Sequence, residues 1–357
     1  MKQLYSLLFL LAAICSAGCG KQETPQPAGS AGDTSSAPAG KSVRVGMVFD
    51  IGGIGDKSFN DGANRGLKRA QADLGAVVEV YEPHDNTDRE TGIRLMTNKK
   101  MDVIIGVGFL FTDSINNLAK EYPNQKFACI DYTVTPGGVV PPNVLALKYK
   151  EEDGSYLVGA LSAWLSKSKK IGFVGGMEIP LIQKFEAGFI NGAKKADPSV
   201  EVMVKYAGNT PEAFANPGKG KELALQMFDQ GADIIFHASG STGLGVFEAS
   251  RERKKLAIGV DSDQYDEAPG FILTSMVKNV DSSVYDTIKA AEDGTFKGGV
   301  LTSGLVHGEG AMENGVDYIY NDKNKALIPD DIHAKVEALR QEIIAGKINT
   351  LEGAKGQ

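Results

Sequence analysis

Residues 43–74 read VRVGMVFDIGGIGDKSFNDGANRGLKRAQADL, and they contain one complete unit of the fold. The stretch begins with an apolar run (43–49), passes through a glycine-rich loop and ends in a helical pattern (62–74). An apolar run of this length without alternation is typical of a strand that is buried on both faces, as in a parallel sheet. The stretch therefore predicts a strand, a loop and a helix in that order.

The same rhythm continues along the chain. Further β-rich apolar runs occupy residues 77–81, 102–108, 126–131, 144–149, 170–176, 200–206, 233–239, 256–261 and 271–277. Helical patterns occupy residues 90–99, 114–121, 154–166, 184–196, 220–230, 243–254, 280–293 and 329–345. About ten strands are too many for one compact sheet of this kind, so we predict an α/β fold with two doubly wound parallel-sheet lobes.

A segment rich in proline and glycine, TVTPGGVVPPN (133–143), interrupts the rhythm and is our predicted first crossing between the lobes. We expect residues 42–132 and about 279–305 to form the N-terminal lobe. The C-terminal lobe is expected to hold about 133–278 and 306–345. In open α/β sheets, ligands bind beyond the carboxyl ends of the strands, so those ends are where we look for a site.

The N-terminus has the pattern of a signal peptide (1–18): Lys2, then an apolar stretch (4–14) too short to span a membrane. Small residues precede Cys19 and resemble the lipobox of bacterial lipoproteins, although Ser16 stands where Leu is usual. In that interpretation Cys19 becomes the acylated first residue. The alternative is an ordinary secreted protein that is cleaved at a small-residue site.

Residues 20–41 are rich in Pro, Gly, Ala, Ser and Thr and have almost no large apolar side chain, so they predict a flexible tether. With Cys19 they form the segment 19–41. We therefore expect a protein held by lipid on the cell membrane or outer membrane, facing the periplasm or the exterior.

Composition excludes several classes of protein. The chain has 357 residues, and 38 basic against 45 acidic residues give a net charge of −7, which argues against a nucleic-acid partner. Its four histidines are scattered, without an H-E-x-x-H motif, and we predict no metal site. No Walker A pattern occurs, so ATP hydrolysis would belong to a separate subunit, and we predict no cofactor.

The stretch FDIGGIGDKSFNDGANRG (49–66) is the most informative about a ligand. Phe59 and Asn60 fall in the first turn of the predicted helix and face the strand ends. An aromatic ring beside an amide suits a flat, hydrogen-bonding ring, because bases stack on aromatic side chains and Asn can bond a base edge. The alternative is a helix cap with Phe59 in the core.

Several motifs together resemble the basic membrane lipoprotein (BMP) family of ABC transporter substrate-binding proteins. They are FDIGGIGDKSFNDGANRG (49–66), GVGFLF (106–111), the aspartate that ends FACIDY, EEDGSYLVGALSAWLS (151–166), IGFVGGMEIPLIQKFEAGFINGAK (171–194), HASGSTGLGVFEA (237–249), GVDSDQ (259–264) and TSMVKNVD (274–281). The resemblance covers roughly residues 43–320, and these proteins are similar to the purine nucleoside receptor lipoproteins.

The resemblance implies a type I periplasmic-binding-protein fold, whose two lobes close about a hinge on a nucleoside, and not an enzyme. It implies that Asp50 and Asn60 bond the base and that Phe59 stacks on it. Phe185 would offer a second aromatic face, and Asp131 would lie by the base or ribose. Gly240 would give backbone contacts, while Asp261 and Lys278 would hold the ribose hydroxyls. If the pocket closes, Asp261 and Lys278 would also neutralise each other.

The expected partners are a nucleoside, the permease subunits of an ABC importer and the membrane, and we expect a monomer. Three alternatives stay open. The first is a receptor of the same fold for a sugar or signalling molecule, the second a surface adhesin lipoprotein, and the third an enzyme that acts on nucleosides. The two aromatic residues with Asn60 favour a base over a bare sugar.

Overall fold

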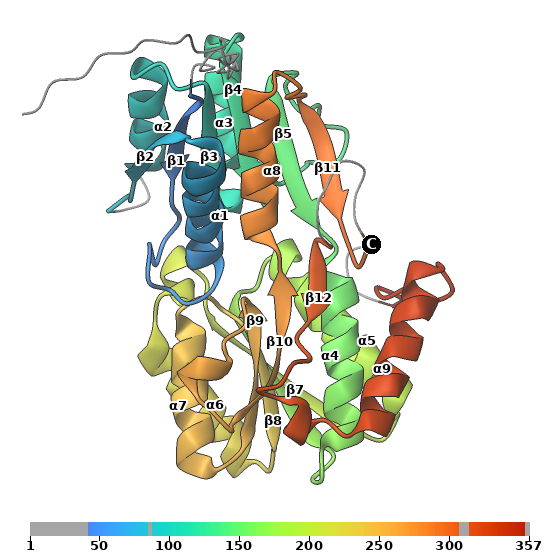
Figure 1. Cartoon of the computed structure of the whole chain (residues 1–357). Coiled ribbons are helices and arrows are strands. Elements are labelled where there is room, and N and C mark those ends of the chain that lie inside the picture. The colour runs from blue at the N-terminus through green and yellow to red at the C-terminus, as the bar shows by residue number, and fades with distance from the viewer. Residues whose placement is uncertain (1–41, 85–87, 307–313, 354–357) are drawn as a thin grey trace, which may run out of the picture. The chain divides into compact units, whose positions relative to one another are not determined.

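The computed structural model describes residues 42–84, 88–306 and 314–353, and the predicted signal peptide and tether lie outside them. The described part contains two lobes, each built on one six-stranded sheet (Figure 1). The elements of the first lobe are β1 (Arg44–Val48), α1 (Phe59–Leu74), β2 (Val77–Tyr81), α2 (Asp88–Asn98), β3 (Val103–Val107), the short 3-10 helix η1 (Phe109–Phe111), α3 (Thr112–Glu121), β4 (Lys126–Ile130), β5 (Val144–Tyr149), α8 (Val280–Glu292) and β11 (Gly299–Ser303).

The second lobe holds the remaining elements. They are α4 (Glu151–Leu165), β6 (Lys170–Met177), α5 (Pro180–Ala196), β7 (Glu201–Gly208), η2 (Pro211–Phe214), α6 (Pro217–Asp229), β8 (Ile234–Ala238), α7 (Thr242–Arg253), β9 (Leu256–Asp261), η3 (Tyr265–Glu267), β10 (Ile272–Lys278), β12 (Val316–Tyr318), η4 (Lys325–Leu327) and α9 (Asp330–Ile344).

The sheets have closely related topologies. The first has the strand order β11-β5-β4-β3-β1-β2 and is wholly parallel. The second has the order β12-β10-β9-β8-β6-β7 and is parallel except for its last strand, β12, which runs antiparallel to β10. All ten predicted strands are present. The predicted fold, two parallel-sheet lobes of the α/β class, is confirmed.

Helices cover both faces of each sheet because successive strand residues point in opposite directions. In β1, Met47 packs in the cluster that includes Leu67 of α1, whereas Val48 packs in the one that includes Ile93 of α2. In β6, Phe173 faces α5 and Val174 faces α6 in the same way. This two-sided burial explains why the strands are continuous apolar runs.

The predicted boundary between the lobes is wrong. The segment 133–143 does not cross between them, because the strand after it, β5, pairs in parallel with β4 and β11 of the first sheet. The chain first crosses one strand later, at Lys150. The prolines and glycines of 133–143 form a loop at the surface of the first lobe, whose last residues bond back to β4 through Phe127 N and Asn143 O (2.9 Å).

Three crossings join the lobes and lie side by side. They follow β5, β10 and β11 (Figure 1). Lys150 N donates to Ser303 O (2.9 Å) and Asn279 N donates to Gly315 O (2.9 Å), so backbone hydrogen bonds tie the three segments together. This arrangement is the hinge between the lobes. Among the helices that the structure describes, none is long and apolar enough to cross a bilayer.

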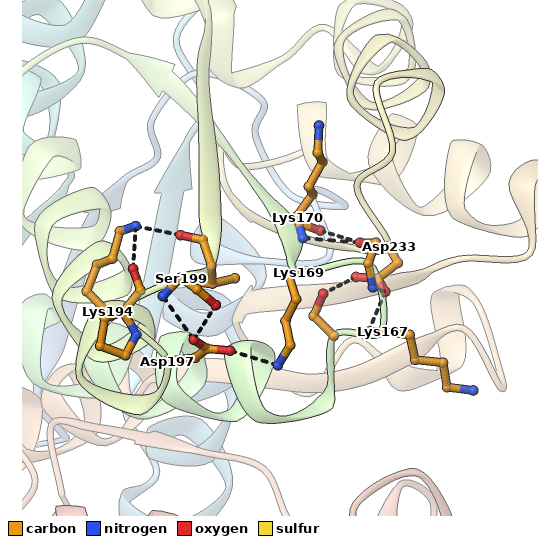
Figure 2. Close-up of polar contacts among 11 residues, drawn as sticks. Lys167, Lys169, Lys170, Lys194, Asp197, Ser199 and Asp233 are labelled. Atoms are coloured by element: carbon orange, nitrogen blue, oxygen red, sulfur yellow. Dashed lines mark hydrogen bonds and ion pairs between the residues drawn. The ribbon is translucent and has the colours of Figure 1, made fainter.

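The turn from α4 into β6, at the far end of the second lobe, is held by one carboxylate (Figure 2). Asp233 accepts hydrogen bonds from Ser166 Oγ (2.7 Å), Lys167 N (2.7 Å) and Ser168 N (2.9 Å). Lys169 adopts a left-handed φ of 59° in the same turn, and its ammonium pairs with Asp197 at 2.7 Å. Lys167 and Lys169 therefore lie in an exposed turn whose backbone Asp233 holds in place.

Helices α4 and α5 approach each other closely because glycines line their contact. A Cβ added at Gly192 would lie 1.9 Å from Tyr156 O, and one at Gly159 would lie 2.1 Å from Phe189 O. Both partners are backbone atoms of the facing helix, so neither can move aside as a flexible side chain could. Helix α4 begins directly after the first crossing, and α5 contributes Ile182 and Phe185 to the cavity between the lobes, so this packing fixes the position of α5 there.

We expect Gly192→Ala to lower the free energy of unfolding by about 1–3 kcal/mol, because the new methyl group must push the two helices apart. The measurement is urea denaturation followed by circular dichroism. The matched control is Gly218→Ala in α6, where the nearest atom to an added Cβ is 3.6 Å away. Equal stability changes for the two variants would contradict the close-packing account.

Candidate functional site

A cavity lies between the lobes, at the carboxyl ends of the central strands of both sheets. It contains about 630 Å³ of space, part of it open to solvent. All eight residues that the sequence singled out line this cavity: Asp50, Phe59, Asn60, Asp131, Phe185, Gly240, Asp261 and Lys278. Parallel strands of the two lobes thus bring together residues up to 228 positions apart.

Aromatic rings form much of the wall. Phe59 begins α1 and Phe185 lies in α5, and the Lys278 ammonium is 4.8 Å and 5.6 Å from their ring centroids. Phe109 of the first lobe and Phe214 of the second meet edge to face, with centroids 6.4 Å apart. The last two rings also line the cavity, so apolar side chains from both lobes surround it.

The loop before α1 is organised by Asp56, which is 3% exposed. Asp56 Oδ1 accepts from Ser58 N (2.9 Å), and Oδ2 accepts from Asn60 N (2.8 Å), so this carboxylate caps the helix. Asp56 bonds the first-turn N–H groups that no helical carbonyl can reach. The sequence analysis did not place Asp56 in the site, although this residue also lines the cavity.

Asn60 is more constrained than the sequence suggested. Its Oδ1 accepts from Asp50 N (3.0 Å), while its Nδ2 donates to Asp56 Oδ2 (3.0 Å) and Ile51 O (3.3 Å). Both amide hydrogens therefore point at protein acceptors, and a direct contact from Asn60 to a ligand is left to Oδ1. The main effect of Asn60 in this geometry is to hold the backbone of Asp50.

Asp50 has a buried partner that the sequence analysis missed. Arg89 of α2 is 5% exposed, and its Nη2 lies 3.3 Å from Asp50 Oδ1, which also accepts from Ile51 N (2.7 Å). Burial raises the pKa of Asp50 to about 6, although the charge of Arg89 opposes this. Near neutral pH the carboxylate is therefore ionised and can accept hydrogen bonds.

Gly108 keeps the second oxygen of Asp50 accessible. A Cβ at Gly108 would lie 2.2 Å from Asp50 Oδ2, and the φ of Gly108 is 114°, which other residues rarely adopt. Oδ2 thus lies beside backbone that carries no side chain. One oxygen of Asp50 is held by the protein, and the other is available to the cavity.

Lys278 and Asp131 form an ion pair at the centre of the site. Lys278 ends β10 in the second lobe, Asp131 follows β4 in the first, and Nζ lies 2.7 Å from Oδ2. Both residues are almost fully buried, with exposed side-chain fractions of 3% and 5%. Asp131 Oδ1 is buried and has no hydrogen-bond partner in the described structure, so one acceptor remains for a ligand.

The predicted pairing of Lys278 with Asp261 is wrong. The ion pairs of Lys278 within the described residues go to Asp131 and, at 3.8 Å, to Glu151. Asp261 Oδ2 instead accepts a hydrogen bond of 2.5 Å from Ser58 Oγ. Burial raises the pKa of Asp261 to about 6, and the charge of Lys278 works against that rise. The two groups still line one cavity.

A second buried pair supports Lys278 and was also missed. Glu151, at the start of α4, is 1% exposed, and its Oε2 lies 2.5 Å from Nζ of Lys184 in α5. Oε2 of the neighbouring Glu152 lies 2.9 Å from the same ammonium. Glu151 and Glu152 directly follow the first crossing between the lobes. Glu151 lies near both Lys184 and Lys278, so ion pairs link the charges near the hinge. Nothing in the sequence distinguishes these buried charges from exposed ones, beyond their position after a strand end.

Left-handed backbone conformations occur at the edge of the same cavity. Asp131 and Asp261 have left-handed φ values of 58° and 63°, and Lys57 beside the cavity has 59°. Non-glycine residues in this region are uncommon and gather at ligand clamps. Gly240, with φ 56°, completes the turn after β8, and an added Cβ would lie 2.8 Å from Phe214 O.

Within the described residues, no group of His, Cys, Asp or Glu side chains could hold a metal ion.

We expect Lys278→Met to lower the free energy of unfolding by about 3–5 kcal/mol, because it leaves a buried carboxylate without its cation. The double variant Lys278→Met with Asp131→Asn should lose less free energy of unfolding than the sum of the losses in the two single variants. Urea denaturation at pH 7 measures this cycle.

The control is Lys289→Met, which removes an exposed pair with Asp293 and should change stability by less than about 1 kcal/mol. Additive losses in the Lys278 and Asp131 cycle would show that the pair is not coupled.

Comparison with known proteins identifies the family. Residues 43–350 match the Bmp family model, described as "ABC transporter substrate-binding protein PnrA-like". An uncharacterized lipoprotein of Pyrococcus horikoshii is 34% identical, over 95% of this chain and 85% of its own. The ABC transporter nucleoside-binding protein BmpA of Lactococcus lactis is 29% identical, over 86% of this chain and 88% of its own.

Solved structures agree with the family match. An ABC transporter solute-binding protein of Aeropyrum pernix K1 superposes with a TM-score of 0.78 and 29% identity, covering 86% of this chain and 92% of the other. Another, from Conexibacter woesei, gives a TM-score of 0.66 at 24% identity and shares the fold. This family binds and delivers solutes and is not enzymatic. The chain belongs to the Bmp family of PnrA-like substrate-binding proteins of ABC transporters.

Proposed function

We propose that this protein binds a nucleoside, most favourably a purine nucleoside, between its two lobes and delivers it to the permease of an ABC importer. The observation that carries the proposal is the composition of one cavity wall. Phe59 and Phe185 offer aromatic faces, and the carboxylates of Asp50, Asp131 and Asp261 lie around them with Lys278. A flat base suits the rings, and the hydroxyls and N–H groups of a nucleoside suit carboxylate acceptors.

The charges of the cavity favour a nucleoside over a nucleotide. Four carboxylates line it against one ammonium, and that ammonium is already paired with Asp131 at 2.7 Å. A phosphate brought into this space would meet Asp50, Asp131 and Asp261 without a free cation from the cavity wall. The relative named as a nucleoside-binding protein supports the same ligand class.

The test is calorimetric titration of residues 41–357, which form one compact unit, after unfolding and refolding to remove carried-over ligand. Adenosine, guanosine, inosine, cytidine, ribose and AMP are compared. We expect a purine nucleoside to bind with a dissociation constant below about 1 μM, and AMP to bind far more weakly.

Phe59→Leu should weaken that binding about tenfold or more, because base stacking contributes ~1–3 kcal/mol. Its control is Phe271→Leu, which changes a partly buried ring outside the cavity wall. Ribose binding without preference for a base would indicate a sugar receptor. No heat with any ligand would reject the nucleoside proposal and favour the adhesin alternative.

We also propose that lipid on Cys19 holds the protein on the membrane, with residues 20–41 as a tether. The lipobox-like residues before Cys19 and the lipoprotein name of a relative support this. Cys19→Ser should move the protein from the membrane fraction to the soluble fraction of expressing bacteria, and its mass should lack acyl chains.

Cys129→Ser is the control, because Cys129 is buried in β4 and should not affect fractionation. Membrane association that survives Cys19→Ser, with an unmodified mass, would reject the anchor.

A further inference from the structure

The start of α1 is hydrogen-bonded to the loop after β9, and these bonds join the two lobes beside the cavity. Gln264 Nε2 donates to Lys57 O (3.0 Å), and Ser262 Oγ donates to Ser58 O (3.2 Å). Arg65 Nη2 donates to Ser262 Oγ (2.9 Å). With the bonds from Ser58 Oγ to Asp261 Oδ2 and to Val260 O (3.5 Å), five hydrogen bonds cross at this one place. Residues 57–65 and 261–264 are called the interlobe contact below.

Gln264 is the most firmly held residue of the interlobe contact. It is 2% exposed, and its Oε1 accepts from Val260 N at 2.7 Å. Its backbone N donates to Ser275 Oγ at 3.1 Å. The bond from Val260 fixes the orientation of the amide group, so the NH₂ group must face Lys57 O of the other lobe. The second lobe thus presents a donor whose direction is set before the first lobe meets it.

A buried histidine completes this support. His237 is 0% exposed, and its Nε2 lies 3.1 Å from Gln264 Oε1. Burial lowers the pKa of His237 to about 4, so the ring is neutral, and Nε2 carries the proton because Oε1 can only accept. A Cβ at Gly243 would lie 2.0 Å from the ring, so Gly243 makes the room that His237 needs.

The interlobe contact borders the predicted ligand contacts without being one of them. Lys57 and Ser58 directly precede Phe59, and Gln264 follows Asp261 by three residues, but Gln264 is not in the cavity wall. Lys57 and Asp261 both have left-handed φ values, 59° and 63°, so backbone strain lies on each side of the contact. Strain of this kind persists only where the surroundings enforce it.

We infer that Gln264 is a positioning residue for ligand binding: it holds the start of α1 in register with the loop after β9 and so stabilises the closed pairing of the lobes. This rests on the proposed function, in which the ligand is held between the lobes. The apparent affinity of such a protein falls with the fraction of molecules in the competent state. Loss of the Gln264 amide should therefore weaken binding although no ligand contact is removed.

The test compares Gln264→Met, which keeps the length of the side chain and removes its amide, with the control Gln226→Met. Gln226 lies on the exposed face of α6, and its side chain donates to Glu222 of the same helix. Spin labels at Lys68→Cys in α1 and Glu248→Cys in α7, in a chain whose three native cysteines are alanine, report the distance between the lobes.

For Gln264→Met we expect a larger population at long distance, both without ligand and with the purine nucleoside that binds the wild type most tightly. We also expect its dissociation rate constant and dissociation constant for that nucleoside to rise about tenfold. Gln226→Met should match the wild type in all three quantities. A role in core packing alone would lower stability and leave the distances unchanged.

Unchanged distances, or changed distances with unchanged affinity, in a folded Gln264→Met variant would overturn the inference. If no nucleoside binds the wild type, the proposed function fails, and the distances without ligand still decide whether Gln264 pairs the lobes. If Gln264→Met does not fold, Ser262→Ala decides instead. It removes two of the five bonds, and we expect the same shift in distance with a two- to fivefold loss of affinity; no change would overturn the inference.

Discussion

A buried ammonium must have its charge neutralised, and Lys278 meets this requirement across the two lobes. Its Nζ lies 2.7 Å from Asp131 of the first lobe and 3.8 Å from Glu151 of the second. Separating the lobes would leave Asp131 and Lys278 without each other, so the cost of burying them depends on the pairing of the lobes. The rings of Phe59 and Phe185 lie within cation–π range of the same ammonium, so its position helps to hold both rings in the cavity wall.

The topology makes this pairing possible. In each lobe the parallel strands end at the same edge, and the two edges face each other across the hinge (Figure 1). A carboxylate at the end of a strand, or one or two residues beyond it, therefore reaches the cavity from a rigid support. Asp50, Asp131 and Asp261 all stand in such positions, and the last two turn the chain through left-handed φ values. The strain is borne by strands whose side chains are fully buried, such as those of β4 and β9.

The sequence was sufficient for the ten strands β1–β10, most clearly for the central ones, because burial on both faces leaves a continuous apolar run without alternation. It was misleading at 133–143, since proline and glycine indicate a turn and carry no information on which sheet the next strand joins. It identified Asp261 and Lys278 as cavity residues but not the partner of Lys278, which depends on distances between lobes. Arg89 and Glu151 were missed for the same reason: an interior charge has no local pattern that separates it from an exposed one.

The carboxylates of the cavity divide their oxygens between two tasks. Asp50 Oδ1 is held by Ile51 N and Arg89, while Oδ2 lies beside Gly108. Asp131 Oδ2 is held by Lys278, and Oδ1 is buried without a partner among the residues that the structure describes. An unsatisfied buried acceptor costs about 1–3 kcal/mol, a cost that a hydrogen-bond donor from a ligand would remove. Because the same side chains join the lobes and offer acceptors to the cavity, ligand recognition and lobe pairing depend on one set of groups.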